Sequence, residues 1–411
     1  MMLPAVRFVR SVRLALEQLL LMPVLVPVIH FAGFARHLFQ TGVGYCRLRS
    51  GRFCVSGVYS FHLLDKRETF SDFTIEPLTV HRTLPVGVED LPPRIRKLFT
   101  RETSYLFSKG GLVTPKGPCL LAKPYAIILD NGKIFKEPSQ QFSKSIFEHP
   151  TIARKKLEID VEVSNGWAAF AHGDLNYYHW LVDLLPLLLL PNYREQIHRE
   201  RPTLILPRFD YAFQKESFAL LELPECEIVN TPNKSNVVRI DRLNVPVLPR
   251  ATNQAHPNVV QALRDQFLPN VANSLSKRRI YLTRMGSKRC ITNEEEIRHL
   301  LERYDISTVR LEDMSFHMQV QLFSNTELVI APHGAGAANI IFLPEGASVI
   351  ELFSPNYVVP CYWRIANVRK CNYAILLGKP YRSFEPESES YMVNPRELEC
   401  LIKRVIAISK R

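Results

Sequence analysis

Several features that mark other protein classes are missing from this 411-residue sequence. Its eight cysteines form no C-x-x-C pair, which argues against a zinc ribbon or a thioredoxin-like dithiol. There is no basic stripe with interleaved aromatic residues and no recognisable nucleic-acid-binding module, so we expect no nucleic-acid partner. Scattered cysteines are typical of a reducing compartment and favour a cytoplasmic location, although their even number also allows disulfides in a secreted protein.

A long apolar run is also missing. The most apolar stretch, residues 19–34, is about 16 residues long, shorter than the roughly 20 needed to span a membrane, and it contains two prolines and a histidine. Three arginines precede it and Arg36 follows it. Residues 1–40 therefore suit a signal peptide or anchor, a peripheral attachment to an anionic membrane surface, or a buried helix, and the sequence leaves these three alternatives open.

The sequence contains enough hydrophobic residues to form large cores, and it carries an excess of positive charge. With 46% hydrophobic residues and this length, we expect two to three globular domains. The formal net charge of +12 favours polyanionic or phosphorylated partners and says nothing about the fold.

The character of the sequence changes along the chain. Residues 52–163 alternate short β-rich runs with turns that contain proline and glycine, which predicts a mixed, mainly β region. From residue 164 onward strands and helices alternate, and this β-α-β succession predicts a parallel, doubly wound sheet in an α/β fold. Asn176 is placed to cap one of the helices, and Thr292 to open a capping box on another.

In a sheet of this kind, ligands bind beyond the carboxyl ends of the strands. One predicted strand is followed by His172 and by a helix that carries His179 and Asp183; a second is followed by Arg284, and a third by His333. Because the fold brings strand ends to one edge, we expect these side chains to converge on one crevice.

The turn after the third strand, His-Gly-Ala-Gly-Ala-Ala-Asn, is typical of an anion site. Its backbone N–H groups, a helix N-terminus and the missing Cβ of Gly336 would admit a phosphate, and the Arg284 guanidinium would donate to phosphate oxygens. Glu351, at the end of the next strand, is placed to accept from ribose hydroxyls. These features predict a nucleotide-diphosphate site made of Arg284, His333, Gly334, Ala335, Gly336, Asn339 and Glu351.

Three motifs, in this order, resemble the catalytic domain of glycosyltransferase family 61. They are HGDLNYYHWLVDLLP at 172–186, IYLTR at 280–284 and APHGAGAANIIFLPEGASVIEL at 331–352. The resemblance covers roughly residues 170–353 and leaves both ends of the chain unexplained. It implies a GT-B architecture with two Rossmann-like lobes, a nucleotide-sugar donor and inversion at the anomeric carbon.

On this basis we expect four regions: an N-terminal segment at 1–40, an acceptor-side lobe at 41–255, a donor lobe at 256–370 and a helical tail at 371–411. The expected activity is transfer of a sugar from a nucleotide sugar to a glycan or glycolipid acceptor, in the synthesis of a surface polysaccharide. A basic, membrane-apposed N-terminus fits a bacterial capsule pathway at the inner face of a membrane. A eukaryotic enzyme of the Golgi or endoplasmic reticulum lumen is the alternative.

The sequence also bears on cofactors. Metal-dependent sugar transferases of the other main architecture hold the diphosphate through a metal on an Asp-x-Asp pair, and no such pair occurs here. The charge of the leaving group would then be offset by Arg284, His333 and backbone donors. We therefore expect no metal and no cofactor, with the nucleotide sugar as substrate.

Two other functions stay open on the sequence alone. Residues 334–339 match the first two glycines of a G-x-G-x-x-G fingerprint but place Asn339 at the third, so a dinucleotide-dependent oxidoreductase is one alternative. A non-catalytic glycan-binding module on a transferase fold is the other, because a fold does not fix a function.

An inverting transferase needs a group that takes the proton of the acceptor hydroxyl. His179 and Asp183 are four residues apart on a predicted helix, so they share a face and can touch. Such a pair is either a structural contact or a catalytic unit in which Asp183 is the base or orients His179. We predict the catalytic unit, with His172 and Asn176 as secondary candidates.

Overall fold

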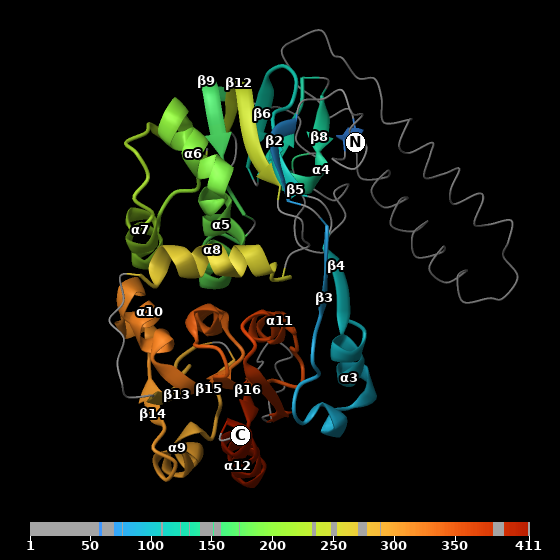
Figure 1. Ribbon diagram of the computed structural model, residues 1–411, viewed down its shortest axis with the longest axis vertical. Coiled ribbons are helices and arrows are strands. Elements are labelled where there is room, and N and C mark those ends of the chain that lie inside the picture. The colour runs from blue at the N-terminus through green and yellow to red at the C-terminus, as the bar shows by residue number, and fades with distance from the viewer. Residues whose placement is uncertain are drawn as a thin grey trace, which may run out of the picture.

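The structure is a computed structural model, and it describes residues 57–59, 70–75, 77–107, 110–123, 125–130, 132–139, 151, 158–171, 173–231, 236–247, 253–269, 278–287, 289–380 and 390–409. The segment predicted at 1–40 and the candidate His172 lie outside these residues. The described chain is a mixed α/β protein with two large sheets, which Figure 1 shows one above the other with helices between them. No helix in this described part is long and apolar enough to cross a membrane.

The sheet formed by the C-terminal half is parallel throughout, which confirms the prediction from the alternating strands and helices. Its strand order is β14-β13-β15-β16-β17. Every residue of β16 is buried, which explains why this strand reads as a continuous apolar run instead of an alternating one. The strands are β13 (Arg278–Leu282), β14 (Ser307–Val309), β15 (Thr326–Pro332), β16 (Ser348–Phe353) and β17 (Asn372–Leu377).

Helices cover both faces of this sheet. In β16, Val349 and Phe353 join one hydrophobic core while Ile350 and Leu352 join another on the opposite face, as the two-residue period of a strand requires. The second core is closed by α9 (Glu294–Glu302) and α12 (Pro395–Ser409). The first is closed by α8 (Pro257–Phe267), α10 (Phe316–Ser324), the 3-10 helix η7 (Ala335–Phe342) and α11 (Cys361–Val368), which lie on the side of the other sheet (Figure 1).

The C-terminal segment differs from the prediction. Residues 371–411 were expected as a helical tail, and α12 supplies a helix over Pro395–Ser409. The first part of the segment is not helical, because β17 pairs with β16 over six residues and is the fifth strand of the sheet. The short run Asn-Tyr-Ala-Ile-Leu-Leu was missed because a brief apolar run has no period that identifies it.

The start of α9 also differs from the prediction. The residue before the helix is Asn293, and no side chain caps the helix there. The Asn293 side chain instead bonds the backbone of Val393 at 2.8 and 2.9 Å, and the Thr292 hydroxyl donates to the Tyr391 carbonyl at 3.3 Å. The predicted capping box is therefore wrong, because both side chains tie the helix start to the C-terminal segment.

The sheet of the N-terminal half has ten strands and mixed directions, in agreement with the mixed β region predicted over 52–163. Its order is β1-β8-β7-β6-β12-β9-β10-β11, with β2 and β5 attached through β12. Strands β9 to β12 run parallel where they pair with one another, whereas β5 and β6 pair with β12 antiparallel. Only the C-terminal sheet is therefore all-parallel. The strands are β1 (Gly57–Tyr59), β2 (Phe70–Ile75), β5 (Gly110–Val113), β6 (Cys119–Ala122), β7 (Ala126–Ile128), β8 (Lys133–Phe135), β9 (Glu158–Ala168), β10 (Thr203–Leu206), β11 (Ile228–Asn230) and β12 (Asn236–Val247).

The helix after β9 is a π-helix, η5 (His179–Leu184), that continues into α5 (Leu185–Leu189). Trp180, Leu181 and Leu184 on η5 are fully buried and anchor this helix in the core. The remaining helices of this half and the short elements are α4 (Lys136–Ser139), α6 (Pro191–Glu200), α7 (Ala212–Ala219), η6 (Leu311–Asp313), β18 (Lys379–Pro380) and β19 (Tyr391–Met392).

One N-terminal segment belongs with the C-terminal sheet. It comprises β3 (Leu78–His81), η2 (Val88–Asp90), α3 (Pro93–Thr100) and β4 (Ser104–Phe107), which Figure 1 shows beside the lower sheet. Val86 exchanges backbone hydrogen bonds with β17, and the Glu102 carboxylate accepts two bonds of 2.7 Å from Arg364 on α11. A boundary at residue 255 therefore does not separate the two halves of the structure.

Candidate active site

Arg284 lies two residues beyond the carboxyl end of β13, in a turn closed by the Ser287 N–H, which donates to the Arg284 carbonyl at 3.0 Å. The Arg284 Nε is buried without a hydrogen-bond partner, and no described carboxylate pairs with this guanidinium. Burial lowers the pKa of Arg284 and the neighbouring Arg289 lowers it further, yet an arginine stays charged at neutral pH. Glu312 attracts this cation electrostatically but makes no hydrogen bond to it. A partly buried guanidinium with no hydrogen-bonded carboxylate favours an anionic ligand.

The two glycines of the turn after β15 make room for protein side chains. A Cβ on Gly334 would lie 1.3 Å from an Nη atom of Arg284, and a Cβ on Gly336 would lie 2.8 Å from Cδ1 of Leu311. The sequence suggested that a phosphate would fill this space. In the structure the guanidinium rests on the backbone at Gly334, so an anion would meet Arg284 there.

His333 and Glu351 form a buried pair. Glu351 is fully buried. One of its oxygens lies 2.5 Å from Nδ1 of His333, and the other accepts from the Tyr373 hydroxyl. Burial raises the pKa of Glu351, and the interactions with His333 and Tyr373 oppose that rise. With both oxygens bonded to protein groups, Glu351 supports His333 in this structure and does not reach the place where we expected it to meet a ribose.

Aromatic rings confine His333. Its ring stacks on Phe353 with centroids 5.0 Å apart and an interplanar angle of 23°, and the rings of Tyr362 and Tyr357 lie 5.2 and 5.3 Å away. The Tyr362 hydroxyl donates to the Gly334 carbonyl at 2.6 Å. These contacts hold the His333 ring in one orientation beside the residue on which Arg284 rests.

His179 and Asp183 are in contact, as their spacing predicted. His179 Nδ1 lies 2.6 Å from Asp183 Oδ2, and the side chains are 15% and 13% exposed. Tyr178 makes an edge contact with Tyr362, with centroids 5.7 Å apart, and Tyr362 in turn contacts His333. Tyr362 thus lies between His333 and Tyr178, the residue before His179.

The remaining predicted residues have structural partners. Asn339 is fully buried: its oxygen accepts from the Tyr177 hydroxyl at 2.7 Å, and its nitrogen donates to Gln319 at 2.9 Å and to the Gly336 carbonyl at 3.1 Å. Ala335 packs against the core. Asn176 accepts from the Tyr178 N–H at 2.9 Å, which confirms its predicted place at the start of the helix.

Sequence reasoning missed Tyr362 and Tyr373. Both lie beyond the last motif, Tyr362 on α11 and Tyr373 on β17. Tyr373 could have been found from its place on an apolar strand beside the strand that carries Glu351. A buried tyrosine hydroxyl needs a hydrogen-bond partner, and a buried glutamate on the next strand supplies one.

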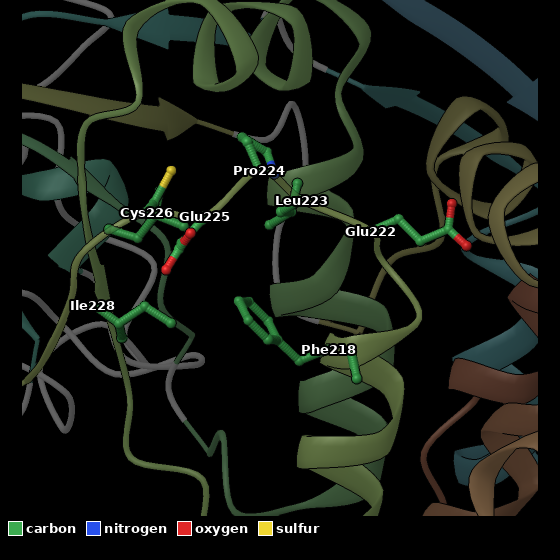
Figure 2. Close-up of a pocket in the computed structure, with 9 residues that line it drawn as sticks. Phe218, Glu222, Leu223, Pro224, Glu225, Cys226 and Ile228 are labelled. Atoms are coloured by element: carbon green, nitrogen blue, oxygen red, sulfur yellow. The ribbon is translucent and has the colours of Figure 1, made fainter.

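A separate cavity of about 190 Å³ lies at the C-terminal end of α7, between that helix and β11. Figure 2 shows Phe218, Leu223 and Ile228 around it and the Glu222 carboxylate pointing away. None of the predicted site residues lines this cavity. Within the described part of the chain, no three His, Cys, Asp or Glu side chains gather in a way that would hold a metal ion.

Comparison with known proteins gives a consistent result. Residues 177–350 match the model of the family described as Glycosyltransferase 61. EGF domain-specific O-linked N-acetylglucosamine transferase of Drosophila melanogaster is 35% identical over 117 residues, 27% of this chain and 20% of that protein. Protein O-linked-mannose beta-1,4-N-acetylglucosaminyltransferase 2 of Xenopus laevis is 38% identical over 88 residues, 20% of this chain and 15% of that protein. The matched stretches thus span about a fifth or less of these relatives.

Among solved structures, the dodecameric heptosyltransferase TibC matches with 10% identity and a TM-score of 0.28, over 73% of this chain and 94% of that one. A likeness this weak supports no argument about the fold.

Proposed function

We propose that the protein transfers a sugar from a nucleotide-sugar donor to a glycan or protein acceptor, because residues 177–350 match the family model of Glycosyltransferase 61. The observation that supports this most directly is Arg284, a largely buried guanidinium without a carboxylate partner at the carboxyl edge of a parallel sheet. A nucleotide diphosphate would supply the missing negative charge.

In this proposal the two sheets are the two lobes of a GT-B arrangement. The donor binds at the carboxyl ends of β13 and β15, beside Arg284 and His333, and the acceptor approaches from the side of η5. His179 and Asp183 take the proton of the attacking hydroxyl. The growing charge on the leaving diphosphate is offset by Arg284 and by backbone donors, without a metal and with inversion at the anomeric carbon.

The names of the two relatives share one donor sugar, N-acetylglucosamine, and name an EGF domain and an O-linked mannose as acceptors. We propose nucleotide-activated N-acetylglucosamine as the first donor to test, with protein-linked acceptors ahead of glycolipids.

These relatives are animal proteins, and for this reason we place the enzyme in the lumen of the endoplasmic reticulum or Golgi rather than in a bacterial capsule pathway. Contact of residues 1–40 with a membrane stays a prediction.

The glycines argue against the oxidoreductase alternative. In a dinucleotide fingerprint the glycines leave room for the pyrophosphate, whereas here Arg284 and Leu311 fill the space at Gly334 and Gly336.

The proposal is tested by incubating the protein with radiolabelled UDP-, GDP- and CMP-sugars, each with an EGF-like domain or an O-mannosylated peptide. We expect label to appear on one acceptor together with release of the nucleotide. A matched sample of the Arg284→Ala variant controls for contaminating transferases. Absence of both transfer and donor hydrolysis across the panel, with no nucleotide binding by calorimetry, would overturn the proposal.

A further inference from the structure

The directions of the hydrogen bonds in the His333–Glu351–Tyr373 cluster determine where its protons lie. Burial raises the pKa of Tyr373 well above its usual value, so its hydroxyl stays protonated and donates to one oxygen of Glu351. The other oxygen of Glu351 faces Nδ1 of His333 at 2.5 Å. The hydrogen bonds with His333 and Tyr373 oppose the effect of burial and favour the ionised form of Glu351. An ionised carboxylate only accepts hydrogen bonds, so in this form it requires the proton of His333 to be on Nδ1.

The other ring nitrogen of His333 is the one left for a ligand. Nε2 has no partner among the described residues, and it is not among the polar atoms that are sealed from solvent without a partner. A neutral imidazole that carries its proton on Nδ1 presents a lone pair at Nε2. Arg284, which lies against Gly334, already supplies hydrogen-bond donors for phosphate oxygens. Nε2 is an acceptor, so it suits a different group of the ligand, a hydroxyl that donates a hydrogen bond.

We propose that Glu351 is a positioning residue that keeps the proton of His333 on Nδ1, so that Nε2 accepts a hydrogen bond from a hydroxyl of the nucleotide sugar. This inference rests on the proposed function and deepens it, because it names the group of the donor that His333 reads. It replaces the role expected from the sequence, in which His333 helps to offset the charge of the leaving group. Tyr373 completes the arrangement by holding the second oxygen of Glu351, and the stacked Phe353 ring fixes the plane of the imidazole.

The first test is spectroscopic and does not depend on activity. In protein labelled with ¹⁵N-histidine at neutral pH, the signal of His333, assigned by its loss in His333→Gln, should show a protonated Nδ1 and an unprotonated Nε2. In Glu351→Gln the amide can turn and donate to Nδ1, so a mixture of the two tautomers is expected. A wild-type His333 with its proton on Nε2 would overturn the proposal.

The second test measures function with matched controls. For the nucleotide sugar that is turned over, Glu351→Gln should raise KM by about twofold to tenfold, because only the fraction of His333 that keeps its proton on Nδ1 still accepts the hydroxyl, and tenfold is the value of the whole hydrogen bond. The change in kcat should be smaller. Glu327→Gln is the control: Glu327 lies on β15 in the same sheet and pairs with Arg279 near the amino end of the strand, and its loss should leave KM unchanged.

A purely structural role for Glu351 is separated by a double mutant. If Glu351 acts through His333, adding Glu351→Gln to His333→Gln costs nothing further in KM, whereas a structural role predicts additive losses. Thermal melting of each variant shows whether it is folded. If Glu351→Gln fails to fold, Tyr373→Phe replaces it: this variant leaves the His333–Glu351 contact in place and should raise KM by a smaller factor. If the proposed function is wrong, the wild-type protein shows no transfer. If only this inference is wrong, the wild type transfers sugar normally, but the losses in KM are additive or His333 carries its proton on Nε2.

Discussion

The structure contains two histidine–carboxylate pairs of nearly equal geometry in very different surroundings. His179 and Asp183 lie 2.6 Å apart on one π-helix of the N-terminal half, and both side chains keep some exposure to solvent. His333 and Glu351 lie 2.5 Å apart on neighbouring strands of the C-terminal sheet, at 7% and 1% exposure, within a shell of aromatic rings. The first pair keeps some contact with solvent, whereas the second pair is almost completely buried and held by its neighbours.

This difference shows that the same two side chains suit different tasks according to burial. A base must reach and release a proton during each turnover, which requires contact with the substrate. A group that recognises a ligand gains from being held rigidly by its neighbours, because less freedom is lost on binding. We therefore assign proton transfer to the first pair and donor recognition to the second, and the predictions below test that division.

The largest effect is expected from the pair His179 and Asp183. Asp183→Asn and His179→Ala should each lower kcat by about a hundredfold to ten-thousandfold, because proton removal from the acceptor is lost. Nucleotide affinity, measured by calorimetry, should stay level, and the double variant should lose little more than either single one, since the two residues act as a unit.

Two results would contradict this prediction. If both single variants lowered the melting temperature and left the turnover of the folded fraction unchanged, the pair would be structural. If kcat stayed normal while nucleotide affinity fell, the pair would belong to the donor side and the base would have to be sought elsewhere.

The next effect concerns Arg284. Arg284→Lys keeps the charge but replaces a fork of donors by a point charge, so affinity for a nucleoside diphosphate should fall about tenfold. The exposed Arg298, which pairs with Glu295 and Glu302 on α9, offers a control in which the same replacement changes nothing. Equal dissociation constants for wild type and Arg284→Lys would show that Arg284 does not bind the diphosphate.

The two glycines give a matched comparison of smaller effects. Gly334→Ala places a methyl group on the Arg284 guanidinium and should weaken nucleotide binding as much as Arg284→Lys does. Gly336→Ala meets Leu311 instead and should lower the free energy of unfolding by about 1–3 kcal/mol with unchanged affinity. Calorimetry and thermal melting of both variants separate the two roles; equal losses of affinity in both would show that the turn binds the ligand through its backbone.

The prediction of the C-terminal sheet from sequence succeeded because its signals are local. Strands and helices alternate there, and a parallel sheet brings the residues after each strand to one edge, which is why Arg284 and His333 could be placed near each other. The contact between His179 and Asp183 followed from their spacing on a helix.

The parts that were wrong or missed depend on contacts between distant segments. Glu102 pairs with Arg364, and Val86 pairs with β17, although more than 250 residues separate the partners. The reason for a glycine at position 334 could not be predicted from the neighbouring sequence. The side chain that occupies the space of its missing Cβ is Arg284, which follows a different strand. Glu351 was placed correctly at a strand end, but only the packing of Tyr373 and His333 around it shows which way its carboxylate faces.

The smallest effect is expected from removal of metal ions. If guanidinium groups and backbone donors offset the charge of the leaving diphosphate, EDTA should change kcat by less than about twofold. Arg284 lies beyond the end of β13, and the positive charge of Arg289, which packs over the Tyr357 ring at 4.4 Å, is close enough to lower the pKa of Arg284. This part of the protein therefore carries two positive charges. EDTA saturated with Ca²⁺ controls for binding of the chelator to this basic site. Loss of activity with free EDTA but not with the saturated form, and its recovery with Mn²⁺, would show that a metal takes part and that the two arginines do not suffice.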